Sequence, residues 1–226
     1  MSTAHASPPR HLMDLREHLR DVLWIGGGTG AGKSSVAIAL AERYRLLRYN
    51  YDWHDSRDHS DRTDPARHPH RARFLRLTMD ERWVLPTPEV MAEDTIAEFG
   101  ERFEMVIEDL LGLPRGERVV AEGFGLLPEL VTELIASPRQ AVWLLPTPDF
   151  RARALAQRGW TIEGTSDPAR ACANKLARDE LLTEHSRSTA RRLGLRVIDV
   201  DGSKDLTKVT AIVERHFRPL LDAHAG

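Results

Sequence analysis

Residues 27–34, Gly-Gly-Thr-Gly-Ala-Gly-Lys-Ser, have the types and the spacing of a loop that binds phosphate. They satisfy the pattern GxxxxGK[ST], follow the apolar run VLWIG and open the helix-forming run SSVAIALAERY. Glycines allow successive backbone N–H groups to turn toward one phosphate, and the following helix directs its positive end to the same point. Lys33 would then reach the outer phosphates of a nucleotide, and the Ser34 hydroxyl would ligate Mg²⁺.

This phosphate-binding loop (P-loop) is the first candidate site. Lysine is scarce in the chain: four of its 32 basic residues are Lys, and one of the four occupies the position that the motif requires. An accidental glycine-rich turn therefore explains the pattern poorly. The residues expected to cradle the phosphates are Gly27, Gly28, Thr29, Gly30, Ala31, Gly32, Lys33, Ser34 and Ser35.

Two carboxylates stand at the ends of predicted strands. The run RVVAEG ends in Glu122, which could hold Mg²⁺ or the substrate; the alternative is a carboxylate that caps a helix. Asp52 follows the apolar run 46–51 and could accept the proton of an attacking hydroxyl. Asp55 and Asp58 compete with Asp52 for that role, and a solvated Asp in a turn is the alternative for all three.

Short apolar runs and helical patterns alternate along the chain. Strands are predicted at Val22–Ile25, Leu46–Tyr51, Arg118–Ala121, Ala141–Leu145 and Arg196–Val200. Helices are predicted at Ser34–Tyr44, Pro88–Leu111 and Leu206–Leu221, with further helix starts at Pro148 and Pro168. This alternation predicts an α/β protein, a three-layer α/β/α fold around a five-stranded parallel sheet. In such a sheet the ligand crevice lies at the carboxyl ends of the strands.

Composition narrows the function classes further. The 226 residues carry 32 basic and 34 acidic side chains, a net charge of −2 that disfavours general DNA binding. One cysteine excludes an intramolecular disulfide, and no apolar run has the length of a membrane span or of a signal peptide. We expect a cytoplasmic protein, a monomer or homodimer, with a tail and short helix at 1–20 and one domain at 21–226.

The segment 53–76, WHDSRDHSDRTDPARHPHRARFLR, interrupts the alternation. It is crowded with Arg, His and Asp, so we expect a surface excursion beside the crevice. The first polar and aromatic residues of this segment are candidates to bind the acceptor, namely Trp53, His54, Arg57, His59 and Arg62. Glu122, at the end of the later run RVVAEG, is a further candidate. Beyond Arg62 the interleaved charges predict a solvated loop that neutralises itself. The His spacing fits no helical zinc pair.

These motifs resemble the nucleoside- and nucleotide-kinase-like branch of P-loop proteins. The relatives are uridine kinases, gluconate and shikimate kinases, and chloramphenicol phosphotransferase, and the similarity covers most of residues 20–220 in order and spacing. GGTGAGKSS followed by a strand ending in Tyr51-Asp52 is similar to the phosphotransferase and uridine-kinase pattern, and VVAEG is similar to the end of the third strand of uridine kinases. The resemblance implies a P-loop NTPase fold that uses ATP and Mg²⁺, with Asp52 as base. It also implies an acceptor-binding insertion at 53–114 and a helical lid at 148–192. Residues 53–114 match no acceptor signature of these families.

The segment PTPDFRARALAQRGW and the helix after Pro168 resemble the arginine-bearing lid of these kinases. On that resemblance Arg158 and Arg178, followed by Arg151 and Arg153, would close over the phosphates. Such arginines stabilise charge in phosphoryl transfer. With 28 Arg in the chain, an exposed helix arginine is the alternative for each of them.

Several activities are compatible with these residues. A carboxylate base favours a hydroxyl acceptor on a nucleoside, sugar, antibiotic or similar metabolite, whereas the Arg-rich excursion favours a nucleoside monophosphate. A nucleotide-dependent NTPase or regulatory switch, and a nucleic-acid end kinase, also stay open. A small-molecule phosphoryl acceptor is the expected partner, and neither nucleic acid nor a membrane is.

Overall fold

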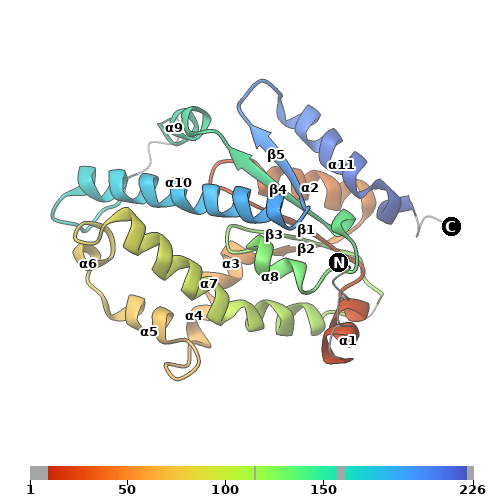
Figure 1. Ribbon diagram of the computed structural model, residues 1–226, viewed down its shortest axis with the longest axis horizontal. Coiled ribbons are helices and arrows are strands. Elements are labelled where there is room, and N and C mark those ends of the chain that lie inside the picture. The colour runs from red at the N-terminus through yellow and green to blue at the C-terminus, as the bar shows by residue number, and fades with distance from the viewer. Residues whose placement is uncertain (1–9, 115, 157–160, 223–226) are drawn as a thin grey trace, which may run out of the picture.

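A five-stranded parallel sheet forms the centre of the molecule (Figure 1). The computed structural model describes residues 10–114, 116–156 and 161–222. The strand order is β2-β3-β1-β4-β5. The strands are β1 (Val22–Gly27), β2 (Leu47–Asn50), β3 (Val119–Glu122), β4 (Ala141–Pro146) and β5 (Arg196–Val200). The predicted fold class is confirmed, and each predicted strand is present.

Helices cover both faces of the sheet. One face is covered by α2 (Lys33–Tyr44) and α11 (Leu206–Asp222), the other by α7 (Pro88–Leu111), α8 (Pro128–Thr132) and α10 (Pro168–Arg192). In Figure 1, α7 and α10 lie on the near side. The remaining helices are α1 (Arg10–His18), α3 (Tyr51–Asp55), α4 (Asp58–Asp61), α5 (Pro69–Arg76), α6 (Met79–Trp83), η1 (Pro138–Gln140) and α9 (Pro148–Ala156). No helix among the described residues is both long and apolar enough to cross a membrane.

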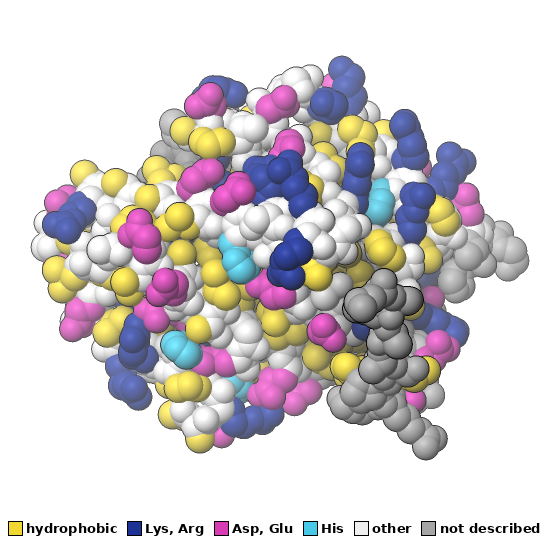
Figure 2. Space-filling view, in the orientation of Figure 1, with side chains coloured by type: hydrophobic (Ala, Val, Ile, Leu, Met, Phe, Trp, Pro, Cys, Tyr) yellow, Lys and Arg dark blue, Asp and Glu magenta, His cyan; other side chains and the backbone are white. Residues whose placement is uncertain are grey.

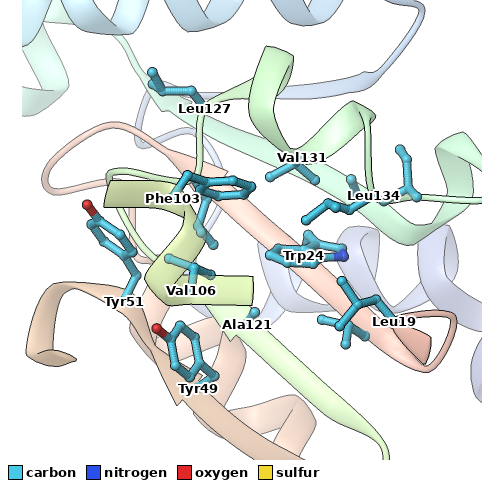
Figure 3. Close-up of a cluster of buried hydrophobic side chains, with 14 of the residues drawn as sticks. Leu19, Trp24, Tyr49, Tyr51, Phe103, Val106, Ala121, Leu127, Val131 and Leu134 are labelled. Atoms are coloured by element: carbon cyan, nitrogen blue, oxygen red, sulfur yellow. The ribbon is translucent and has the colours of Figure 1, made fainter. Parts of the chain in front are cut away.

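Strands buried on both faces carry apolar side chains at successive positions. On β1, Leu23 and Ile25 point to the α2 and α11 side, while Trp24 points to the α7 side. Figure 3 shows Trp24 packed between Phe103 of α7 and Leu134; the Trp24 and Phe103 ring centroids lie 6.5 Å apart. This core holds β1 and β3 rigidly behind the P-loop.

Cap chemistry places the helices that follow β4. Asp167 accepts a hydrogen bond from the Arg170 backbone N–H at 3.0 Å, and Pro168 takes the first helical position, as predicted. The Thr147 hydroxyl likewise accepts from the Phe150 N–H at 3.4 Å at the start of α9. Both helices therefore begin where the predicted caps stand.

The expectation that the charges beyond Arg62 form a solvated loop that neutralises itself is wrong. Residues 69–76 fold into α5, and the basic side chains between residues 67 and 73 pair with the acidic face of α7. Asn50 begins α3 by accepting from the Trp53 N–H at 2.7 Å. The counter-charges on α7 stand at least 21 residues further along the chain, so the local sequence does not reveal them.

Candidate functional site

The P-loop connects the end of β1 to the start of α2. A Cβ on Gly27 would lie 2.0 Å from the Leu144 carbonyl oxygen, so only glycine fits beside β4. Gly32 has φ +84° and is the N-cap residue of α2, where a left-handed backbone favours glycine. The loop therefore turns immediately into the positive end of α2, the geometry of an anion-binding site.

Lys33 is the buried cation of this loop. Its side chain is 7% exposed, and Nζ donates to the Gly28 carbonyl oxygen at 3.0 Å. Burial lowers the pKa of Lys33, against the opposing charges of Asp52, Glu122 and Asp179. Lys33 forms no ion pair with any residue that the structure describes. A buried ammonium with a single carbonyl partner leaves two donors for an anion, so the loop fits a phosphate.

Glu122 and Ser34 meet beside this loop. The Ser34 hydroxyl donates to Oε2 of Glu122 at 3.0 Å, and the Asn50 amide donates to Oε1 at 2.6 Å. The register of the sheet dictates this meeting, because Glu122 pairs with Ile25 of β1 and with Asn50 of β2. Glu122 is fully buried, and burial raises its pKa. A hydroxyl and a carboxylate are the oxygen ligands that Mg²⁺ prefers.

Asp52 is the acid in the first turn of α3 that faces the P-loop. Its Oδ1 accepts the Phe124 backbone N–H at 3.0 Å, and its charge acts on both Lys33 and Glu122. Phe124 itself lies beside Lys33, with Nζ 6.0 Å from the ring centroid. Asp52 is exposed, so it is open to a ligand from the crevice.

The two competing acids have other partners. Asp55 accepts the Tyr51 hydroxyl at 3.0 Å and pairs with the buried guanidinium of Arg102. Asp58 lies 3.1 Å from Nδ1 of His54. Of the three aspartates, the structure therefore leaves Asp52 beside the P-loop and engages the others elsewhere.

A polar face of α10, which was not predicted from the sequence, completes the surroundings of the loop. Lys175 donates to Asp179 at 2.8 Å, and Asp179 is fully buried. One turn further along α10, the Thr183 hydroxyl lies beside Gly28: a Cβ placed on Gly28 would be 3.0 Å from the Thr183 hydroxyl oxygen. Arg151 is 2% exposed; it donates to Thr183 at 2.5 Å and to Glu180 at 2.7 Å, and its Nε has no hydrogen-bond partner among the described residues. The signal was present in the sequence, because Lys175, Asp179 and Thr183 are spaced by four on one helix face.

The predicted lid arginines occupy different environments. Arg178 donates to Asp179 at 2.7 Å and to Thr95 at 3.3 Å, and its guanidinium carbon lies 5.4 Å from the Trp83 ring centroid. Arg153 is exposed and donates to the Asp201 carbonyl oxygen at 3.4 Å. Arg158 lies outside the described residues. Neither Arg153 nor Arg178 is brought into contact with the P-loop.

Two of the predicted acceptor residues form an exposed pair next to Asp52. The guanidinium carbon of Arg57 lies 4.8 Å from the ring centroid of Trp53, and Trp53 is 47% exposed. Arg57 has no carboxylate partner among the described residues. An aromatic face beside a cation is suited to an anionic or π-bearing ligand.

The other three predicted acceptor residues make internal contacts. His54 stacks on Tyr49 with ring centroids 4.6 Å apart. His59 is fully buried and its Nε2 lies 2.7 Å from Asp109, while Arg62 pairs with Asp109 at 2.7 Å. The structure thus directs His59 and Arg62 to α7 and not to the P-loop.

A cavity of about 80 Å³ lies within the predicted acceptor region. It is enclosed by α5, α6, α7 and α10, and Trp83, Arg82 and Arg178 line it. Arg82 donates to the Leu75 carbonyl oxygen at 2.9 Å, and its Nε has no hydrogen-bond partner in the described part of the chain. A ligand in this cavity would contact Arg178, the residue adjacent to Asp179.

Comparisons with known proteins concern the fold. No family model matches the chain, and no curated protein matches its sequence. One similar structure is an uncharacterized protein from Eubacterium ventriosum, with 16% identity, a TM-score of 0.45, and coverage of 88% of this chain and 98% of that one. Another is shikimate kinase from Acinetobacter baumannii in complex with shikimate, with 13% identity, a TM-score of 0.45, and coverage of 92% and 97%.

The parallel sheet and the P-loop after its central strand define the class: the chain is a three-layer α/β/α protein with the P-loop NTPase fold. A fold of this kind hosts many activities. The particular activity is therefore argued from the residues around Lys33.

Proposed function

We propose that the chain is an ATP-dependent small-molecule kinase that transfers the γ-phosphoryl group to an acceptor hydroxyl. The observation that carries this proposal is the position of Asp52, whose carboxylate is held by the Phe124 N–H beside Lys33. A carboxylate open to the crevice is placed to orient an acceptor hydroxyl and to take its proton. A binding module for nucleotides alone has no use for such a base.

The phosphates are proposed to be held by the P-loop residues 27–35. Lys33 exchanges its bond to Gly28 for phosphate oxygens, and the helix start of α2 stabilises their charge. Ser34 and Glu122 are the proposed ligands for Mg²⁺, directly or through its waters. Bound Mg²⁺ neutralises phosphate charge and orients the transferred group.

Among the predicted lid arginines that the structure describes, buried Arg151 contacts Thr183 beside Gly28 and pairs with Glu180 at 2.7 Å. We retain Arg153, Arg158 and Arg178 as proposed lid residues that would have to move to reach phosphate. On the acceptor side, Trp53 and Arg57 are the proposed first contacts, since they are exposed next to Asp52.

A second candidate is a nucleoside-monophosphate kinase. Arg57, which has no carboxylate partner among the described residues, favours it, because a guanidinium beside an aromatic ring suits a phosphate attached to a base. The two candidates differ in their need for a base: a hydroxyl must lose a proton during transfer, whereas a phosphate is already ionised.

The test is a transfer assay with Mg²⁺ and γ-labelled ATP against pooled nucleosides, sugars, aminoglycoside-type antibiotics and monophosphates. Label on a hydroxyl compound, lost in Asp52→Asn, supports the first proposal. Label on a monophosphate, retained in Asp52→Asn, supports the second. Label released only as inorganic phosphate at a rate indifferent to every pool contradicts both and indicates an NTPase or switch.

A further inference from the structure

A groove of about 630 Å³ lies at the amino ends of β4 and β5, whereas the P-loop follows the carboxyl end of β1. At the groove the chain enters β4 and β5 from η1 and Gly194, and α11 forms the other wall. All five strands are parallel, so the two sites are separated by the length of the sheet. The groove is therefore independent of the proposed kinase site.

The lining of this groove is basic and contains no acid. Arg139, Arg196, Arg215 and His216 provide its polar groups, and Leu195 and Ile212 are apolar parts of its wall. In Figure 2, dark blue side chains surround a cyan histidine over α11 and the start of β5. Such a concentration of positive charge is notable in a chain with a net charge of −2.

The arginines of the groove come from η1, β5 and α11, and they differ in their pairing from other arginines of α2 and α11. Arg218 of α11 pairs with Asp222 at 3.3 Å, and Arg43 of α2 pairs with Glu214. The side chains of Arg139, Arg196 and Arg215 form no ion pair or hydrogen bond with any residue in the described part of the chain. All three residues are exposed on the wall of the groove, so an anion bound there would meet guanidinium groups that have no counter-ion among the described residues.

His216 is a fixed group at the centre of this charge. Its Nε2 donates to the Ala141 carbonyl oxygen at 2.9 Å, which ties α11 to the start of β4. Burial lowers the pKa of His216, and the charges of Arg139 and Arg196 lower it further. The positive field of the arginines therefore reaches into the groove, where an anion would experience it.

We propose that this groove binds a small organic phosphate, with its phosphate group on Arg139, Arg196 and Arg215 and its apolar body on Leu195 and Ile212. The guanidinium fork matches phosphate oxygens, and Arg presents it bidentately. The volume of the groove falls in the range of small-molecule sites, which is larger than an isolated phosphate ion requires.

The experiment titrates the full chain with 1-naphthyl phosphate and follows the imidazole resonances of His216 by NMR, with calorimetry for affinity. We expect a saturable shift and a rise in the pKa of His216, because the bound dianion opposes the arginine charges. Arg196→Gln and Arg215→Gln should each weaken binding at least tenfold. Arg218→Gln, whose arginine is paired on the same helix, should change the affinity less than twofold.

Thermal melting of each variant verifies that these exposed substitutions leave the fold intact. Three results would overturn the proposal: no saturable shift at millimolar ligand, equal affinity for 1-naphthol, which lacks the phosphate, or a response of His216 to a duplex oligonucleotide but not to 1-naphthyl phosphate. Affinities for the groove are taken from the His216 shift, which is local to it, so none of these results depends on phosphate binding or transfer at the P-loop.

Discussion

The P-loop edge of the sheet and the helical segment from α3 to α7 both hold buried charge, but they neutralise it differently. At the P-loop, Lys33 is buried against a carbonyl oxygen and has no ion pair with a described residue. Between α3 and α7, the guanidinium of Arg102, which is 1% exposed, pairs with Asp55. Charge left without a partner indicates a binding site, and charge that is paired indicates structure.

The same criterion separates residues that sequence alone treats as equals. Arg57 and Arg62 lie five positions apart in one basic segment. Arg62 is held by Glu108 and Asp109, while Arg57 rests on Trp53 without a carboxylate among the described residues. The contrast in pairing places Arg62 in the internal contacts of α7 and leaves the exposed Arg57 as the residue proposed above to contact the acceptor.

The largest expected effect is a loss of phosphoryl transfer on substitution of Asp52, beside the P-loop. Asp52→Asn keeps an oxygen to accept the Phe124 N–H but cannot take a proton, so we expect kcat to fall by about 10² to 10⁴. Nucleotide affinity should be nearly unchanged, as measured by calorimetry. Asp58→Asn is the matched control, since Asp58 contacts His54 and not the P-loop. Full transfer by Asp52→Asn would remove Asp52 from the mechanism.

The next largest effect is a loss of thermal stability when the buried ion pair between Asp55 and Arg102 is broken. Asp55→Asn leaves the Arg102 guanidinium, which is 1% exposed, without its closest carboxylate. Breaking a buried pair costs about 3 kcal/mol, which for a chain of this size lowers Tm by about 6–12 °C. Asp94→Asn breaks the exposed pair with Arg73 and should cost at most about 1 kcal/mol. Equal losses of Tm in the two variants would contradict the distinction between buried and exposed pairs.

A smaller effect, a gain rather than a loss of folding stability, is expected on substitution of Glu122. Its pKa is raised by burial, so the ionised carboxylate destabilises the folded chain at neutral pH. Glu122→Gln should increase stability by about 0.5–2 kcal/mol and abolish the effect of Mg²⁺ on nucleotide binding. The gain should be present at pH 7 and should disappear as pH falls to the ordinary carboxyl pKa of 4.5. Thermal melts of both proteins across pH, with and without Mg²⁺, measure both effects.

The smallest effect is the acid sensitivity of the helical segment. Burial lowers the pKa of His59, so the folded chain resists a proton that the unfolded chain accepts. Stability should therefore decrease as pH falls below the ordinary His value of 6.5, by at most about 1.4 kcal/mol per pH unit. His59→Gln can still donate to Asp109 and should flatten this slope. An unchanged slope of unfolding free energy against pH would show that another group is responsible.

Much of the fold was predictable because its determinants are local. The central strands β1, β3 and β4 are short runs of buried, mostly apolar residues, and the helices after β4 begin at Thr147-Pro148 and Asp167-Pro168, where cap residues stand next to proline. The P-loop is likewise contiguous, since its glycines, Lys33 and Ser34 lie within eight residues. The pairing of Ser34 with Glu122 also follows from adjacent parallel strands.

The partners of the charged segment were not predictable in the same way. Asp52, Asp55 and Asp58 look alike along the chain, and their separation depends on Phe124, Arg102 and the turn of α3. Asp179 and Thr183 lie near Lys33 and Gly28 because α10 packs beside the P-loop, and this packing depends on residues about 150 positions further along the chain.

The α/β alternation, the phosphate-binding loop and the acids at the strand ends could be derived from the sequence, because each depends on neighbouring residues and on backbone preference. Which charges are paired and which have no ion-pair partner among the described residues depends on the folded arrangement. That arrangement sets the Coulomb and desolvation terms between side chains that are far apart in the chain. Lys33 beside Asp52, and the basic groove around His216, were both defined at that level.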